Sequence, residues 1–272
     1  MRDSLSWPIP VSERISILYI ERESIERDGH ALVAVSGARR TVIPVGKTSA
    51  IFLGPGSTLS HAAAALCTLE QTLLIWVGEA GVRLYTSANP LGNPDRVLRQ
   101  APLHLDPVAR LGAARAIFRL MFGEEAPPRR SVEQLRGLEG AKVKQILRDL
   151  TATHGISWNG RNTSGDHDAV SLAISTATAA LYGLSEAVIL ALGYSPAIGF
   201  VHSGAPRSFV FDLADTVKFR SVVPLAVKLV AASPNNLEKR VRTACRDLFV
   251  STRMASTLVE NTETILYADD RD

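Results

Sequence analysis

The stretch GFVHSGAPRSFVFDLADTVKF, residues 199–219, places polar groups inside an otherwise apolar sequence. His202, Asp212 and Asp215 stand there among phenylalanines and valines. Asp212 and Asp215 are three residues apart, so on a helix both carboxylates would lie on one face. Because an unpaired charge is costly to remove from water, these groups must be paired, neutralised or bound to a metal. The stretch therefore predicts a partly buried helix that carries chemistry.

The sequence on both sides of this stretch predicts an all-helical second half of the chain. Asp106-Pro107 is an N-cap followed by a proline at the first helical position, which predicts a helix to about Phe122. Ser131 and Gln134 have the spacing of a capping box, which predicts a helix to about Thr153. The other predicted helices cover residues 168–183, 185–193, 209–231 and 237–257.

The first part of the chain predicts strands. Residues 15–22, ISILYIER preceded by Arg14, alternate between apolar and polar side chains, and Asp28-Gly29 is a hairpin turn between apolar flanks. Short apolar runs bounded by Gly, Ser or Pro follow, interrupted by one predicted helix at 57–70. The turn-rich segment SANPLGNPD separates the two parts. We therefore predict an α+β protein with a β-rich domain at residues 1–90 and an all-α domain at residues 91–272.

The composition excludes several classes of protein. With 46% hydrophobic and 21% charged residues, the 272-residue chain is globular and not disordered. The two cysteines, Cys67 and Cys245, lie in apolar runs, which indicates buried free thiols in a reducing compartment. Neither a signal peptide nor a run of about 18 uncharged apolar residues is found. These features predict a cytoplasmic protein that does not span a membrane.

The net charge of +3 is unevenly distributed. Residues 129–148 hold six basic side chains against two acidic ones, and residues 204–246 hold eight against three. Basic segments of this kind suit a polyanion such as DNA. Solvated faces of charged helices would give the same composition, so charge alone leaves both interpretations open.

The most specific chemical signal is a set of oxygen and nitrogen ligands. Glu139 lies near the inward-facing stripe of the helix that follows the capping box, and with His202 and Asp215 it could hold Mg²⁺ or Mn²⁺. The alternative is that Asp215 pairs with Lys218 and that His202 is a satisfied core histidine. A serine hydrolase is disfavoured because the G-x-S-x-G motif is absent. The loop at 54–60 lacks the lysine of a phosphate-binding loop.

Eight segments, in their order and spacing, resemble the CRISPR-associated integrase of the adaptation complex, in its type I-E branch. Five lie in the second half: RRSVEQLRGLEGAKV, WNGRN, YGLSEAVILALGYSPAIGFVHSG, SFVFDLADTVKF and VRTACRDLF. Three lie in the first part: RISIL, PVGKTSAIFLGPGSTLSHAA and WVGEAGVRLY. The resemblance covers nearly the whole chain. It implies a β-sandwich domain followed by an α-helical catalytic domain, which agrees with the pattern of predicted elements.

The resemblance also implies the site and its reaction. Glu139, His202 and Asp215 match the metal-binding catalytic trio of the family, and Asp212 matches an additional acidic position. The metal would be Mg²⁺ or Mn²⁺. The family joins captured DNA fragments, called prespacers, to a CRISPR repeat: a 3′-hydroxyl attacks a phosphodiester at the repeat boundary, so one phosphodiester replaces another without ATP.

The implied partners are double-stranded prespacer DNA, CRISPR repeat DNA, a second copy of the chain and the family's small ferredoxin-like partner protein. Tyr182 matches a position near the active centre. Basic positions of the family that predict DNA contacts are Arg83, Arg136, Lys142, Lys144, Lys218 and Arg242. Two other functions remain open: a metal-dependent endonuclease that cuts branched DNA with the same site, and a non-enzymatic DNA-binding scaffold.

Overall fold

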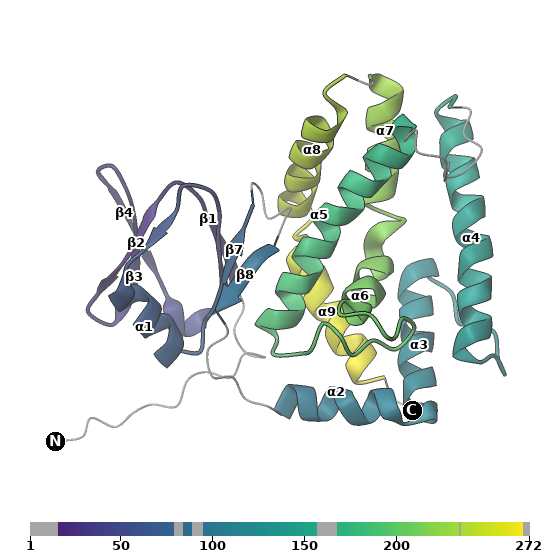
Figure 1. The fold of residues 1–272 in the computed structure, drawn as a ribbon, viewed down its shortest axis with the longest axis horizontal. Helices are drawn as coiled ribbons and strands as arrows, with labels where there is room; N and C mark the ends of the chain where they lie inside the picture. Colours follow the sequence, from purple (N-terminus) through teal and green to yellow (C-terminus); the bar gives the residue numbers. More distant parts are fainter. Residues whose placement is uncertain (1–15, 79–83, 89–94, 157–167, 234, 269–272) are drawn as a thin grey trace. The chain divides into compact units, whose positions relative to one another are not determined.

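The chain forms two compact units. The computed structural model describes residues 16–78, 84–88, 95–156, 168–233 and 235–268. The units comprise Met1–Arg96 with Leu190–Tyr194, and Val97–Ile189 with Ser195–Asp272. The first unit contains the strands and the second the large helices, so the predicted α+β class is confirmed (Figure 1). The predicted domain boundary between residues 90 and 91 lies outside the described residues.

Two four-stranded sheets form the described part of the β-rich unit. In the sheet ordered β1-β5-β7-β8, β5 runs parallel to β1 and β7, and β8 is antiparallel to β7. In the sheet ordered β4-β3-β2-β6, the first three strands are antiparallel and the short β6 is parallel to β2. The strands are β1 (Ser16–Ile20), β2 (Ser24–Asp28), β3 (Ala31–Ser36), β4 (Arg39–Ile43), β5 (Thr48–Leu53), β6 (Thr58–Leu59), β7 (Leu73–Val77) and β8 (Leu84–Ala88).

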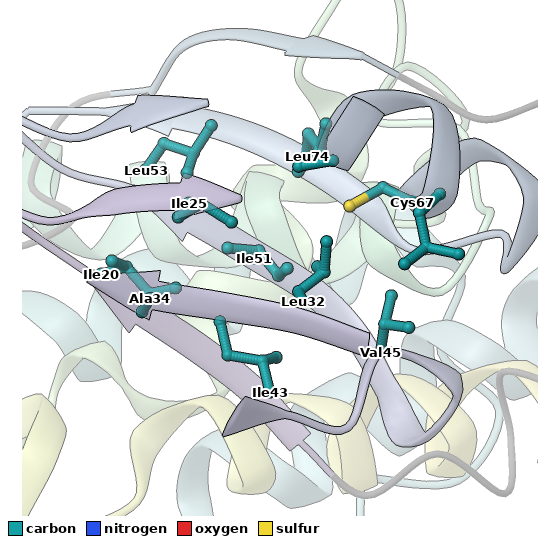
Figure 2. Close-up of a cluster of buried hydrophobic side chains, with 12 residues drawn as sticks. Ile20, Ile25, Leu32, Ala34, Ile43, Val45, Ile51, Leu53, Cys67 and Leu74 are labelled. Carbon is teal, nitrogen blue, oxygen red and sulfur yellow. The ribbon is translucent and has the colours of Figure 1, made fainter. Parts of the chain in front are cut away.

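One hydrophobic core joins both sheets and the helix α1 (His61–Leu69). Figure 2 shows Leu32 and Ile25 of one sheet beside Ile51 of the other, with Cys67 of α1 at the edge of the cluster. The predicted sandwich-like arrangement is therefore confirmed. Burial raises the pKa of the Cys67 thiol to about 12, and burial does the same for Cys245 in the helical unit. Both thiols are free and buried, as predicted.

The helices of the second half begin where their caps predict. The Asp106 carboxylate accepts hydrogen bonds from the N–H groups of Val108 and Ala109, at 2.7 and 3.0 Å, and Ser131 forms the predicted capping box with Gln134. The helices are α2 (Asp95–Leu105), α3 (Pro107–Phe122), α4 (Val132–Thr153), α5 (Ala169–Ala191), α6 (Ser208–Lys218), α7 (Val222–Ala232), α8 (Leu237–Ser251) and α9 (Met254–Leu266).

Several helices differ from the prediction. The helix predicted at 57–70 begins only at His61, because residues 58–59 form the short strand β6. The predicted helices at 168–183 and 185–193 are one helix, α5, which continues through the buried Gly183 and Ser185. An internal glycine costs a helix about 1 kcal/mol, which the packing of this apolar helix exceeds. Conversely, the segment predicted as 209–231 contains two helices, α6 and α7, and the segment predicted as 237–257 contains α8 and only the start of α9, which continues to Leu266. The helix α2, which includes Pro102, was not predicted at all.

Two helices, α5 and α6, are largely buried in the helical unit. α5 is long and apolar enough to cross a membrane, but 67% of its most apolar stretch is buried inside the protein, as expected of a core helix. α6 packs against α3, α7 and α9, and Figure 1 shows it in the interior of the helical unit. The helical part of the 199–219 stretch, α6, therefore lies in the interior of the helical unit.

Candidate active site

α6 brings two carboxylates into a nearly dry environment. Of its eleven residues, all but Phe211 and Lys218 are buried. Asp212 is 1% exposed and Asp215 is 6% exposed. A buried carboxylate without partners would be strongly destabilising, so each must be compensated by the groups around it. The two carboxylates are compensated in different ways.

Asp212 receives four hydrogen bonds from the segment just before α6. One oxygen, Oδ2, accepts from the backbone N–H groups of Phe200 (2.5 Å) and Val201 (3.1 Å). The other, Oδ1, accepts from the backbone N–H of His202 at 2.9 Å and lies 2.7 Å from its Nδ1. With both oxygens engaged, Asp212 serves as an anchor for this segment and for the imidazole, and its oxygens are not free to bind a metal.

The close approach of this segment to α6 requires a glycine at position 199. A Cβ on Gly199 would lie 2.5 Å from the carbonyl oxygen of His202, 2.8 Å from the carbonyl carbon of Ser208 and 2.9 Å from Oδ2 of Asp212. All three distances are shorter than van der Waals contact. The backbone and the Asp212 carboxylate can take these positions only because residue 199 has no side chain.

His202 is oriented by Asp212 and keeps one ring nitrogen available. A carboxylate accepts only, so the hydrogen bond assigns the proton of the neutral imidazole to Nδ1 and leaves the lone pair on Nε2. The hydrogen bond with Asp212 raises the pKa of His202, although burial opposes this. The side chain is 28% exposed, so it is not a fully enclosed core histidine. Its Nε2 can bind a metal or accept a proton.

Asp215 forms the ion pair with Lys218 that the sequence left open as an alternative. The Lys218 ammonium lies 2.5 Å from Oδ1 of Asp215, and the two side chains are 15% and 7% exposed. Burial lowers the pKa of Lys218, but the negative charge of Asp215 and the neighbouring Tyr182 outweigh burial and raise it overall. The buried carboxylate is therefore compensated by a cation.

Glu139 of α4 belongs to the same group of charges. Burial raises the pKa of its carboxyl group, and the charge of Asp215 raises it further, while His202 and Lys218 oppose both effects. Glu139 also lines a small cavity together with Val201, the residue before His202. Glu139, His202, Asp212 and Asp215 therefore lie in the same region of the helical unit.

The donor set is chemically suited to a divalent cation. Among the residues that the structure describes, no three His, Cys, Asp or Glu side chains are arranged as a metal site. Glu139, Asp215 and Nε2 of His202 nevertheless offer two carboxylates and one imidazole, the ligands that Mn²⁺ and Mg²⁺ accept. Burial, the main cause of the raised pKa of Glu139, and the charge of Asp215 both disfavour its negative charge, which a bound dication would stabilise. These residues therefore fit the metal, provided that Asp215 exchanges Lys218 for it.

The predicted DNA-contact residues of α4 lie in different surroundings. Arg136 is exposed and lines a small cavity together with Glu139 and Val201. Lys144 is exposed as well. Lys142 forms an ion pair with Glu124.

The remaining predicted DNA contacts lie elsewhere. Arg242 pairs with Glu238 at 3.1 Å and lines an open groove of about 520 Å³ at the start of α8. Lys218 is engaged with Asp215. Arg83 and the WNGRN motif lie outside the described residues.

Tyr182 packs beside α6. The resemblance matches this residue to a position near the family's active centre. Its ring lies 5.0 Å from that of Phe211, which in turn lies 5.6 Å from the His202 ring. The Arg207 guanidinium lies 5.8 Å from the Tyr182 ring centre and pairs with Glu186 at 2.9 Å. Neither Arg207 nor Glu186 was singled out in the sequence, because an ordinary surface ion pair has no distinctive spacing.

Comparison with protein families places this site in a known context. The family model described as "CRISPR associated protein Cas1" matches residues 121–261, which include all four acidic and histidine residues of the site. A curated relative from Geobacter sulfurreducens, the CRISPR-associated endonuclease Cas1, is 46% identical over 97% of this chain and 89% of its own. The protein of the same name from Escherichia coli K12 is 45% identical over 97% of this chain and 88% of its own.

Solved structures give the same result. The crystal structure of a TtCas1–DNA complex is 33% identical to this chain, with a TM-score of 0.86 over 93% of this chain and 97% of the other. A casposase bound to its integration product is 14% identical, with a TM-score of 0.65 over 93% of this chain and 96% of the other, and therefore shares the fold.

Proposed function

Because this chain belongs to the CRISPR-associated protein Cas1 family, we propose that it is the DNA integrase of CRISPR adaptation, of the type I-E branch. It would join the 3′-hydroxyl ends of double-stranded prespacer DNA to CRISPR repeat DNA, in the cytoplasm. The coarser activity, that of a CRISPR-associated DNA endonuclease, is the one named for its curated relatives. The observation that supports the proposal is the oriented His202 beside Asp215 and Glu139.

The side chains suit an in-line phosphoryl transfer. A divalent cation held by Glu139, Asp215 and His202 would supply Lewis-acid stabilisation of the charge on the phosphate. Asp212 holds the imidazole in one orientation and one tautomer, by the hydrogen bond at 2.7 Å. In the reaction, the fragment's 3′-oxygen forms a bond to phosphorus and loses its proton, while the bond from phosphorus to the leaving oxygen breaks and that oxygen gains a proton.

Two alternatives share parts of this site. A metal-dependent endonuclease acting on branched DNA would use the same residues with water as the nucleophile. A non-enzymatic scaffold would keep the basic surface but would not require a half-buried glutamate and an oriented imidazole. The burial of Glu139 and Asp215 beside one another, which raises the pKa of Glu139, favours an enzyme over a scaffold.

One assay separates the three functions. The full-length protein, with its small partner protein, is incubated with an end-labelled fragment and a supercoiled plasmid that carries a repeat array, in Mn²⁺, in Mg²⁺ or in EDTA. A joined product identifies the integrase, cut branched DNA alone identifies the endonuclease, and a mobility shift alone identifies the scaffold. We expect joining that EDTA abolishes.

The basic residues of the helical unit should determine how salt affects DNA binding. We expect Arg136→Ala, Lys144→Ala and Arg242→Ala each to reduce the slope of log affinity against log salt by about one unit, because each phosphate contact releases about one counterion. The measurement is a fluorescence titration of labelled duplex DNA at several salt concentrations.

A matched control for this titration lies in the other unit. Arg40 of β4 is also partly exposed and pairs with Asp28 at 3.5 Å, so Arg40→Ala removes a similar charge without a predicted DNA contact. Its slope should equal that of the wild-type protein. An unchanged slope for Arg136→Ala, Lys144→Ala and Arg242→Ala alike would mean that these residues only form solvated helix faces.

We further propose that the β-rich unit forms a homodimer and that two such dimers flank a dimer of the family's small ferredoxin-like partner. Joining two fragment ends to sites one repeat apart requires more than one active site. Apolar side chains remain exposed on edge strands of both sheets: Val42 on β4 and Tyr85 on β8 are each 67% exposed. Such edges favour pairing with another chain.

Light scattering tests the proposed assembly. We expect a dimer for the isolated full-length chain, and self-association of residues 1–90 expressed alone. A strictly monomeric full-length chain at micromolar concentration, with or without the partner protein, would rule out this assembly and leave the proposed chemistry unaffected.

A further inference from the structure

The backbone from Ser195 to His202 forms neither helix nor strand, yet its residues 199–201 are buried. Buried N–H and C=O groups need partners, and an irregular segment satisfies few of them within itself. At the end of this segment the N–H groups of Phe200, Val201 and His202 all donate to Asp212. The carbonyl groups of Ser195 and of residues 198–200 accept from side chains of α2 and α3, whereas that of Pro196 accepts from the N–H of Phe209 in α6.

Gln100 of α2 contributes most of these contacts. Its Nε2 donates to the carbonyl oxygens of Ser195 and Ile198, at 3.1 and 2.8 Å, and its Oε1 accepts from the N–H of Ser195 at 2.8 Å. The residue is 0% exposed. A fully buried carboxamide whose three hydrogen bonds all go to one segment acts on that segment and not on its own helix.

Two more side chains continue the same line of contacts. His104, one helical turn after Gln100, places Nδ1 2.6 Å from the carbonyl oxygen of Gly199. Arg110 of α3 donates from Nε to the carbonyl oxygen of Phe200 at 2.8 Å. We call Gln100, His104 and Arg110 the loop clamp.

We propose that the loop clamp positions the imidazole of His202 for the reaction. The clamp fixes the carbonyl groups on one side of the segment, and Asp212 fixes the N–H groups that follow. His202 is the last residue of the segment, so its backbone and ring are set by both. This inference rests on the proposed role of His202 in catalysis, and it assigns the clamp residues a positioning role that acts through the 195–202 segment.

The segment has little freedom to accommodate the loss of the clamp without moving. Gly199 has no space for even one additional carbon atom between α6 and the backbone of His202. A shift of the carbonyl groups at 195–200 therefore displaces the N–H groups bound to Asp212 and the Nδ1–Oδ1 hydrogen bond with them. A displacement of about 1 Å at a reacting group costs about 100-fold in rate.

The test replaces Gln100 by leucine in the full-length protein. We expect Gln100→Leu to join fragments about 100-fold more slowly, with unchanged DNA affinity in a gel shift. Amide hydrogen exchange should show reduced protection of Phe200, Val201 and His202. Nitrogen NMR of the metal-free protein should show a mixture of His202 tautomers in place of the single form with its proton on Nδ1.

A matched control separates positioning from general stability. Asn261 of α9 is also a buried carboxamide, and it donates to Oγ1 of Thr216 at 2.8 Å without touching the 195–202 segment. Asn261→Leu should lower the melting temperature and leave the joining rate, the exchange of the three amides and the His202 tautomer as in the wild-type protein.

A second variant makes the clamp dependent on pH. In Gln100→Glu the carboxylate faces two carbonyl oxygens and repels them, whereas the protonated carboxyl group can donate to one of them. The joining rate of Gln100→Glu, divided by that of the wild-type protein at the same pH, should rise as the pH falls. Gln100→Leu should show no such recovery.

The outcomes distinguish the clamp from the proposed function. Wild-type joining by Gln100→Leu would overturn the clamp, and so would slow joining with unchanged amide exchange and an unchanged His202 tautomer. If the wild-type protein neither joins nor cuts DNA, the proposed function fails, while the exchange and NMR measurements still show whether Gln100 fixes His202.

Discussion

Replacing His202 by asparagine is expected to lower the rate of fragment joining at least about 1,000-fold, because general acid–base catalysis or a metal ligand is lost. The asparagine amide can still donate to Asp212, so the buried carboxylate keeps a partner and the fold is preserved. What disappears is the lone pair of Nε2, which no atom of asparagine replaces. The measurement is a single-turnover joining assay with saturating DNA, alongside circular dichroism.

The histidine at the end of α4 provides the matched control. His154 donates from Nδ1 to the carbonyl oxygen of Leu150, at 2.9 Å, and lies outside the group of charges around Glu139. His154→Asn should therefore join fragments at the wild-type rate. A joining rate within tenfold of wild type for His202→Asn would exclude His202 from the reaction and with it the proposed mechanism.

The second large effect concerns Glu139 and has two readouts. We expect Mn²⁺ to raise the melting temperature of the wild-type protein, and Glu139→Gln to abolish this rise and to lower the joining rate about 1,000-fold. In EDTA the same substitution should stabilise the protein at neutral pH. A neutral amide carries no charge, so it avoids both the cost of burying a charge and the repulsion from Asp215, the two effects that raise the pKa of the glutamate.

The sign of the pH dependence follows from the direction of that shift. The folded-state pKa of Glu139 lies above its unfolded value of 4.5, so this residue favours folding most below pH 4.5. That contribution is lost as the pH rises through the folded pKa. The stability advantage of Glu139→Gln in EDTA should therefore be present at neutral pH and vanish on acidification below pH 4.5.

An exposed carboxylate on the same helix is the control for Glu139. Asp149 of α4 accepts a hydrogen bond from Gln145 at 2.8 Å and is exposed. Asp149→Asn should leave the joining rate and the Mn²⁺-dependent stabilisation unchanged. If Glu139→Gln gave no stability gain in EDTA at neutral pH, neither the burial of the Glu139 charge nor its repulsion from Asp215 would destabilise the protein significantly.

Local signals predicted part of the fold. The N-cap at Asp106 and the capping box at Ser131 fixed the starts of α3 and α4, because both depend only on hydrogen bonds within the first turn. The division of α5 at Gly183 was wrong, since the packing of a buried helix outweighs the preference of one residue. α2 was missed because the prolines before it and Pro102 within it resemble a linker.

The site, like the fold, was predicted only in part. The types and spacing of Asp212 and Asp215 predicted a shared helix face, the residue types also singled out Glu139 and His202, and the resemblance implied that they form one catalytic set with Asp215. Sequence alone did not predict that Asp212 would accept hydrogen bonds from three backbone N–H groups. The residue type aspartate does not show whether its carboxylate binds a metal, a lysine or the backbone of a loop. The contacts of Gln100 were equally invisible, since its partners are carbonyl groups about 95 residues later, a separation that local patterns do not span.

Asp212 and its hydrogen-bond partners are close in the sequence, and this has a consequence for how the protein folds. All four hydrogen bonds to its carboxylate come from residues 10 to 12 positions earlier, so they form by closing one short loop at little entropic cost. Glu139 reaches the site from a separate helix and requires a much longer closure. The His202–Asp212 half can therefore form early and survive partial opening, whereas detachment of α4 removes Glu139 first. Transient unfolding would thus inactivate the protein while half of its catalytic centre stays intact.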